Sequence, residues 1–118
     1  MNETRPSTLR LPRPRLTPVY RLEATLGEPL DLGDIRYTLR TDAGDLLYVQ
    51  SRGVRHGSAE VLARLVRGDD VDASEYTFRT STRIETAAPA LDWLNKGIFA
   101  GVGGREAAAV IYETYLVG

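Results

Sequence analysis

The best candidates for chemistry in this sequence are polar side chains that alternate along one predicted strand. Residues 76–86 alternate strictly, so one face of the strand carries only polar side chains. This polar face consists of Thr77, Arg79, Ser81, Arg83 and Glu85. Two interpretations are open. The row is the solvated outer face of a two-sided sheet, or it lines the interior of a barrel, where alternate residues point into a cavity.

If the row points inward, Arg79 and Glu85 are the candidate catalytic residues. An arginine donates two parallel hydrogen bonds to a carboxylate, an enolate or another planar oxyanion. A glutamate moves protons as a general base when burial raises its pKa. Both charges need partners in that position, because an unpaired buried charge is costly.

Seven further residues are candidate ligand-binding groups. The tyrosines lie on predicted strands and favour either strand packing or an aromatic pocket. The arginines flank a predicted hairpin and are turn and edge charges or a second oxyanion contact. The tryptophan and asparagine follow the long strand, as a core plug or a ligand wall. The set is Arg40, Tyr48, Arg52, Tyr76, Trp93, Asn95 and Tyr112.

Six strands and one helix must position these residues. Alternation predicts strands over 19–26, 36–41, 46–50, 76–86, 98–102 and 108–117. The Asp42-Ala43-Gly44-Asp45 turn predicts a hairpin between the second and third strands. Ser51-Arg52-Gly53 is expected to break the third strand, and Gly103-Gly104 to form a turn. Ser58 is expected to cap a helix over 58–66 that ends at Gly68.

This pattern predicts a mostly β fold: a small antiparallel barrel or barrel-like sheet with one short helix. The chain has 118 residues, which suits one domain. Residues 1–18 hold four prolines among four arginines and are expected to form a flexible tail. Residues 19–118 are expected to form the single folded domain. An arm that contacts an acidic partner or a second subunit is the alternative for the tail.

Composition excludes several function classes. There is no cysteine and only one histidine, His56, so disulfides, thiolate metal sites and two-histidine sites within one chain are excluded. No metal or cofactor is expected. The net charge is −1, which argues against a nucleic-acid partner. No apolar run reaches about 18 residues, so no membrane span is expected. The absence of a secretory signal and of cysteine favours a cytoplasmic location.

Several strings in this order resemble a family. They are Tyr37-Thr38-Leu39-Arg40-Thr41-Asp42, Tyr48 with Arg52-Gly53, Tyr76-Thr77-Phe78-Arg79-Thr80, Ile84-Glu85-Thr86, Trp93-Leu94-Asn95 and Tyr112-Glu113-Thr114-Tyr115. Together they are similar to a bacterial and fungal family, number three thousand two hundred thirty-seven in the domain-of-unknown-function series. The resemblance implies a small antiparallel barrel like those of the allene-oxide-cyclase type, which hold apolar ligands. Some of those relatives catalyse cyclisation or isomerisation.

The sequence departs from that family after the first strand. Leu32-Gly33-Asp34 runs almost directly into Ile35-Arg36-Tyr37, where family members carry about two more strands. A barrel lacking them has open edges that need a cover or a partner subunit. The leading hypothesis is a barrel that binds a small hydrophobic or carbonyl-containing ligand, as a cofactor-independent isomerase or cyclase. The alternatives are a non-catalytic carrier or sensor, and a structural module or homo-oligomer.

Overall fold

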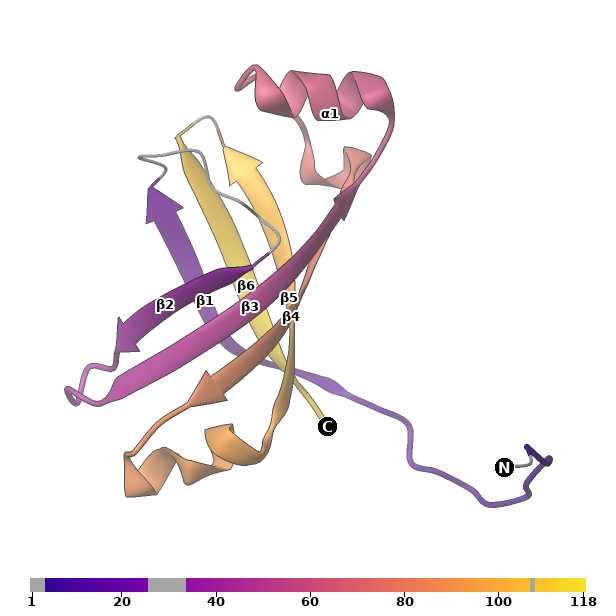
Figure 1. Cartoon of the computed structure of the whole chain (residues 1–118), viewed down its shortest axis with the longest axis vertical. Helices are drawn as coiled ribbons and strands as arrows, with labels where there is room; N and C mark the ends of the chain where they lie inside the picture. The colour runs from indigo at the N-terminus through magenta and orange to yellow at the C-terminus, as the bar shows by residue number, and fades with distance from the viewer. Residues whose placement is uncertain (1–3, 26–33, 107) are drawn as a thin grey trace.

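A computed structural model describes residues 4–25, 34–106 and 108–118. Six strands form one antiparallel sheet in the order β1-β6-β5-β4-β3-β2. Figure 1 shows that the sheet curls strongly, so that the fold is a half-barrel with β1 and β2 at its two edges. The elements are β1 (Leu16–Thr25), β2 (Ile35–Arg40), β3 (Leu46–His56), α1 (Ala59–Val66), η1 (Ala73–Glu75), β4 (Thr77–Glu85), η2 (Pro89–Lys96), β5 (Ile98–Glu106) and β6 (Ala109–Val117).

The expected fold class is confirmed: the sheet is antiparallel and barrel-like, with one α-helix. Helix α1 begins after Ser58, whose hydroxyl accepts a hydrogen bond from the Val61 amide at 3.1 Å. The hairpin between β2 and β3 is also as expected, and Gly44 adopts a φ of +92° in its turn. Asp72 and Glu75 form a reciprocal capping box at η1.

Three expected boundaries are wrong. Ser51-Arg52-Gly53 does not break β3, because its small inward residues pack against threonines of β4 while Arg52 faces out. Gly103 and Gly104 lie inside β5 rather than in a turn, paired with Tyr112 and Ile111. Strand β1 begins at Leu16, opposite Val117, so part of the expected tail belongs to the sheet. Leu26 lies outside the described residues.

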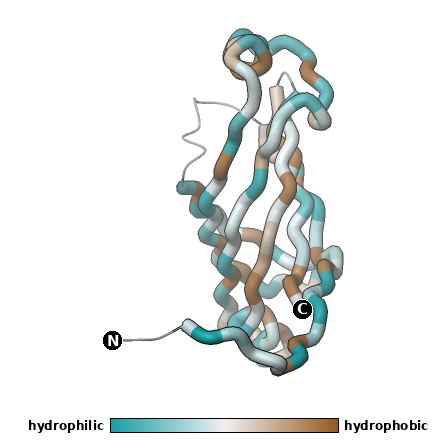
Figure 2. The backbone as a smooth tube through the Cα atoms, turned by 90° about the vertical axis from the view of Figure 1, so that its right-hand side faces the viewer, coloured by the Kyte–Doolittle hydropathy of each residue, from teal (hydrophilic) through white to brown (hydrophobic). Residues whose placement is uncertain are grey.

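The concave face of the sheet holds two hydrophobic clusters. The cluster near α1 consists of Leu65, Val71, Tyr76, Phe78, Val110 and Tyr112. The cluster near η2 consists of Leu47, Val49, Ile84, Leu94 and Phe99. Figure 2 shows hydrophobic and hydrophilic residues interspersed along the strands. Buried and exposed residues alternate along β3 and β4, which places their hydrophobic side chains on one face.

A belt of buried hydroxyl groups also lies on the concave face. Ser51 and Thr80 each lie 3.1 Å, oxygen to oxygen, from the hydroxyl of Thr82. These hydrogen bonds satisfy groups that would otherwise be costly to bury. Gly101 leaves the space that the belt needs, because a Cβ atom there would lie 2.1 Å from Thr80 Oγ1. The structure thus requires glycine at this point of β5.

Candidate functional site

The two edge strands of the half-barrel face each other across an open seam. They share no backbone ladder, because β1 pairs with β6 and β2 pairs with β3. Among the described residues, one side-chain hydrogen bond crosses the seam: the hydroxyl oxygens of Tyr20 and Tyr37 lie 2.7 Å apart. Burial, and after it the hydrogen bond with Tyr20, raises the pKa of Tyr37 well above its ordinary value. Tyr37 therefore stays a neutral phenol and keeps this bridge at neutral pH.

A cleft of about 440 Å³ opens at this seam. Its walls come from both edge strands, and its floor from β3, β4 and η2. The apolar lining includes Val19, Leu22, Leu39, Leu47, Ile84, Leu91 and Leu94. Such a volume with a mostly apolar lining is typical of small-molecule sites. We call it the seam cleft.

Besides the Tyr20 hydroxyl and the Trp93 indole, the polar groups of the seam cleft are few. They come from Arg21 on β1 and from Arg40, Thr41 and Asp42 where β2 ends. Arg21 already has an ion-pair partner, because its Nη1 atom lies 3.1 Å from Glu113 Oε1. Arg40 and Asp42 thus supply opposite charges at the mouth of an apolar cleft.

Two of the predicted ligand-binding residues, Arg40 and Trp93, line the seam cleft. Trp93 is 46% exposed and its ring lies 6.4 Å from that of Phe99, centroid to centroid. Asn95 is not part of the lining of the seam cleft, and its ligand-binding role stays a prediction. Its amide bonds the backbone of Thr86 in both directions, at 2.8 and 2.9 Å, and so fixes η2 to the end of β4.

Arg79 and Glu85, the predicted catalytic residues, lie on the exposed convex face, so the inward orientation is wrong. Arg79 donates from Nη1 to the carbonyl oxygen of Phe78 at 2.9 Å. Glu85 lies 3.6 Å from Arg83 Nε, with both side chains more than 60% exposed. The two predicted residues share no cavity in the described part of the chain. Their catalytic role stays a prediction.

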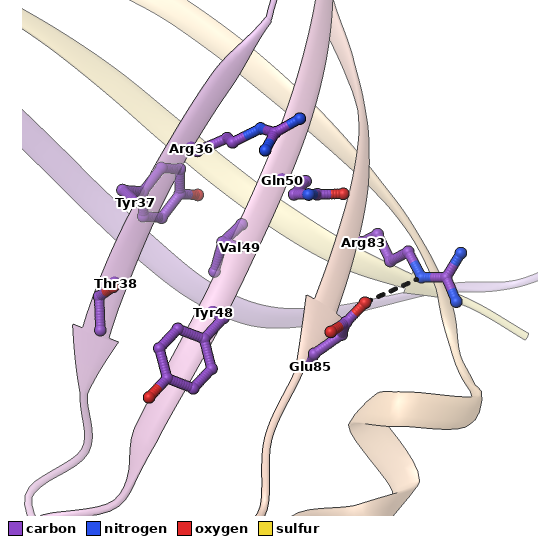
Figure 3. A pocket seen from close by; sticks show the side chains of 8 residues that line it. All are labelled: Arg36, Tyr37, Thr38, Tyr48, Val49, Gln50, Arg83 and Glu85. Atoms are coloured by element: carbon purple, nitrogen blue, oxygen red, sulfur yellow. Dashed lines mark ion pairs between the residues drawn. The ribbon is translucent and has the colours of Figure 1, made fainter.

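Tyr48 and Arg52 also lie on the convex face, in shallow depressions. Figure 3 shows Tyr48 and Glu85 on the walls of one of about 250 Å³, together with the Arg83–Glu85 ion pair. Arg52 lines a neighbouring one of about 260 Å³. Both are smaller than the seam cleft, and all three are open to solvent.

Tyr76 and Tyr112 lie on the concave face, but in the cluster near α1 rather than in the seam cleft. The Tyr76 hydroxyl accepts a hydrogen bond from the Arg105 amide at 2.9 Å. The structure thus divides the predicted ligand-binding residues among three places. Leu39 and Leu91 of the cleft were absent from the prediction; the alternation of β2 marks Leu39 as inward, but nothing in the sequence marks the seam.

The remaining observations concern metal ions and membranes. Among residues 4–25, 34–106 and 108–118, no group of three or more acidic or histidine side chains is placed to hold a metal ion. No helix in the described part of the chain is long and apolar enough to cross a membrane.

The curled sheet, the end helix and the interior clusters define a small β-barrel-like protein. The chain belongs to the protein family of unknown function DUF3237, whose model matches residues 32–117. It is 37% identical over 84 residues to a UPF0311 protein of Rhodopseudomonas palustris, covering 71% of this chain and 55% of that relative. A UPF0311 protein of Bradyrhizobium diazoefficiens is 36% identical over 90 residues, covering 76% and 59%. The chain thus spans somewhat over half the length of these curated relatives.

Solved structures show the same fold. A conserved protein of unknown function from Rhodopseudomonas palustris superposes with a TM-score of 0.70 at 36% identity, over 72% of this chain and 57% of that one. A beta-barrel like protein from Acinetobacter baumannii superposes with a TM-score of 0.72 at 29% identity, over 92% of this chain and 99% of that one. The family resemblance seen in the sequence is confirmed. The segment where the sequence departs from the family falls largely on residues 26–33, outside the described residues.

Proposed function

We propose that this protein binds a small, largely apolar molecule in the seam cleft and acts as a non-catalytic carrier or sensor. The observation that carries this proposal is the cleft itself: about 440 Å³, lined mostly by aliphatic side chains, with few polar groups. Aliphatic side chains left open to water at this site gain free energy when a ligand covers them, in proportion to the apolar area removed from water.

The tyrosine bridge favours a compact molecule over an added β-strand. A peptide that paired along β1 or β2 would have to pass the point where Tyr20 and Tyr37 meet across the seam. It would break that hydrogen bond and leave partly buried hydroxyls unpaired, which costs about 1–3 kcal/mol. A compact ligand between the bridge and η2 leaves the bridge intact.

The rim suggests one polar group on the ligand. A carbonyl or similar acceptor at one end can take a hydrogen bond from Arg40, while the rest of the molecule contacts the aliphatic walls. Binding without turnover is favoured because Arg79 and Glu85, the residues expected to react, face away from this cleft. Isomerase or cyclase activity stays a prediction.

Binding of Nile red, an uncharged apolar dye, tests the proposal. Trp93 is the only tryptophan in the chain and lies on the cleft wall, so its emission reports occupancy directly. We expect saturable Nile red fluorescence with one site per chain and a concurrent change in Trp93 emission. A dye signal that does not saturate, or that leaves Trp93 emission unchanged, contradicts the proposal.

Two matched variants distinguish binding of Nile red in the seam cleft from non-specific binding to the protein surface. Val19→Phe fills the seam cleft, whereas Val54→Phe makes the same change on the exposed convex face. We expect Val19→Phe to weaken Nile red binding by about tenfold, equivalent to about 1.4 kcal/mol. Val54→Phe should leave affinity within about twofold. Equal affinities for the two variants would place the dye elsewhere.

A further inference from the structure

Within the described residues, three buried polar atoms on the concave face have no hydrogen-bond partner. They are Arg55 Nη1, Arg105 Nε and the Tyr112 hydroxyl oxygen. Buried polar groups are nearly always paired in folded proteins, and a buried donor without an acceptor is costly. Three such atoms in one small domain, all in the half of the interior next to α1, call for an explanation.

The strand register gathers these side chains around Phe78. Arg55 lies opposite Phe78 in the β3–β4 ladder, and Gly103 lies opposite Tyr112 in the β5–β6 ladder. Gly103 allows the Phe78 ring to lie close against β5, because a Cβ atom at this position would lie 2.8 Å from that ring. The rings of Phe78 and Tyr112 meet edge to face at 5.8 Å.

Arg105 lies two residues beyond Gly103 on the same face of β5, so it belongs to this group as well. Strands β4 and β5 pair over only four residues, ending at Arg79 and Val102, and they diverge toward α1 (Figure 1). Phe78 and Tyr76 lie where these two strands separate. The Tyr76 hydroxyl links the strands there by accepting a hydrogen bond from the backbone amide of Arg105. The two arginines thus flank a gap between ladders rather than a continuous sheet.

The charge of this region is unbalanced. Arg55 and Arg105 are the only charged side chains on the concave face of the described strands, and no carboxylate lies there within the described residues. Their surroundings are the apolar cluster near α1. Guanidinium groups in such surroundings need acceptor oxygens with negative charge.

We infer that Arg55, Arg105 and Tyr112 form a binding site for the oxyanion of a small molecule, a carboxylate or a phosphate, at the α1 end of the half-barrel interior. All three supply donors, and the guanidinium fork matches the geometry of either anion. Phe78 and the surrounding apolar cluster favour a carboxylate attached to an apolar or aromatic body. This site is distinct from the seam cleft, which is lined by the cluster near η2, and the two proposals stand or fall separately.

Two details support an approach from the concave side. Burial raises the pKa of Tyr112, so its phenol keeps the proton that it would donate. A neighbouring hollow of about 310 Å³ is lined by Arg105 together with Glu106, Glu113 and Val71, a member of the cluster near α1. The carboxylates of Glu106 and Glu113 repel an anion from that hollow, whereas no carboxylate lies on the concave face of the described strands.

NMR titration of the full chain with sodium benzoate tests the inference. Arg105 Nε–H, one of the unpartnered donors, gives a directly observable ¹⁵N–¹H signal. We expect benzoate to shift this signal saturably, and benzyl alcohol, its neutral counterpart, to leave it unchanged. Inorganic phosphate in a parallel titration separates the two anions: tighter binding of benzoate identifies a carboxylate site, and tighter binding of phosphate identifies a phosphate site. No saturable shift with either anion overturns the inference.

Matched arginine variants locate the anion. Arg55→Gln and Arg105→Gln should each weaken the better-binding anion by about tenfold, because each removes a charge-assisted hydrogen bond. Binding in Arg55→Gln is followed at Arg105 Nε–H, and binding in Arg105→Gln by isothermal titration calorimetry. Arg79→Gln removes the same charge from the convex face and should leave affinity within about twofold. Equal losses in all three variants would show general electrostatic attraction and overturn the site.

The Tyr112→Phe variant distinguishes an anion-binding role of the hydroxyl from a structural one. Removal of a buried hydroxyl without a partner should leave thermal stability of the ligand-free protein unchanged or raised, while anion affinity falls. A loss of stability would show that the hydroxyl is already paired within the chain. The acids Glu28 and Asp31 lie outside the described residues and are tested together as Glu28→Gln/Asp31→Asn. Anion binding that appears only in this double variant would overturn the inference for the natural chain.

Discussion

The two faces of β4 are equally regular in sequence, since their residues alternate strictly. They differ in burial and in what they contribute to the packing of the fold. On the concave face, Phe78 and Ile84 are 1% exposed and anchor both hydrophobic clusters. On the convex face, Arg79 and Glu85 are exposed, and the nearest ion pair is a long one in open solvent. The comparison teaches that alternation alone does not tell which face of a strand the sheet encloses.

The largest expected effect is on the concave face of β4. Phe78→Ala removes a ring that contacts Tyr112 and fills the divergence between β4 and β5. We expect a loss of about 3–5 kcal/mol in the free energy of unfolding, measured by urea denaturation. The neighbouring Arg79→Ala, on the convex face, should change that free energy by less than about 0.5 kcal/mol. Similar losses in both variants would contradict the assignment of the two faces.

The next effect compares two glycines of β5. Gly101→Ala places a Cβ atom against the Thr80 hydroxyl and disturbs the buried belt, so we expect a loss of about 1–3 kcal/mol in unfolding free energy. Gly104→Ala is the control, because its nearest neighbour would be Ala73 Cβ at 3.7 Å, an ordinary contact. It should leave stability unchanged or raise it slightly by restricting the unfolded chain. Denaturation curves recorded side by side decide between these outcomes.

A smaller effect is expected at the seam. Tyr37→Phe removes the hydrogen bond to Tyr20 and should lower the unfolding free energy at pH 7 by about 0.5–1.5 kcal/mol. The pKa of Tyr37 is raised in the folded protein, so the folded state holds its proton more tightly than the unfolded state. Stability is therefore fully present below about pH 10, the ordinary tyrosine value, and falls as the pH rises above it.

The control for this pH effect is the variant itself. Denaturation between pH 8 and pH 11 should show a shallower fall of stability in Tyr37→Phe than in the unchanged chain. The fall should not vanish, because the pKa values of Tyr112 and Tyr115 are also raised. Parallel curves would mean that the seam tyrosine does not contribute to the pH dependence.

The smallest effect is expected at the convex face. Glu85→Gln breaks the ion pair with Arg83, in which the side chains are 74% and 64% exposed. Exposed pairs of this kind contribute little, so we expect a change below about 0.5 kcal/mol in chemical denaturation at low salt. A loss above about 2 kcal/mol would mean that Glu85 has a buried partner and would reopen its candidacy as a functional residue.

Much of the fold follows from the sequence, because alternation in β4 and β6 names the members of each face correctly. Tyr76, Phe78, Thr80, Thr82 and Ile84 share the buried side, as the pattern predicts. The pattern does not say which face is enclosed. Threonine suits both water and a hydrogen-bonded interior, and here the buried hydroxyls of Thr80 and Thr82 bond each other while Thr82 also bonds Ser51.

The candidate sites were harder to predict for two physical reasons. Ser51-Arg52-Gly53 resembles a strand end, which removed Arg55 from consideration as an inward strand residue. The structure shows that Gly53 continues the strand opposite Thr80, and Arg55 then points inward beside Phe78. The seam cleft depends on how far the sheet curls, since it joins residues of β1 and β2 that no local spacing relates.

The open seam also implies that amide hydrogen exchange differs between the edge strands and the central strands. Strands β4 and β5 have a hydrogen-bonded neighbour on each side, whereas β1 and β2 each have one. Amide hydrogens on the free edges of β1 and β2 should therefore exchange with solvent through small local openings, and those shared by β3 and β4 only through global unfolding. The half-barrel thus has a stable centre and two edge strands that, in the described part of the chain, are joined by the hydrogen bond between Tyr20 and Tyr37.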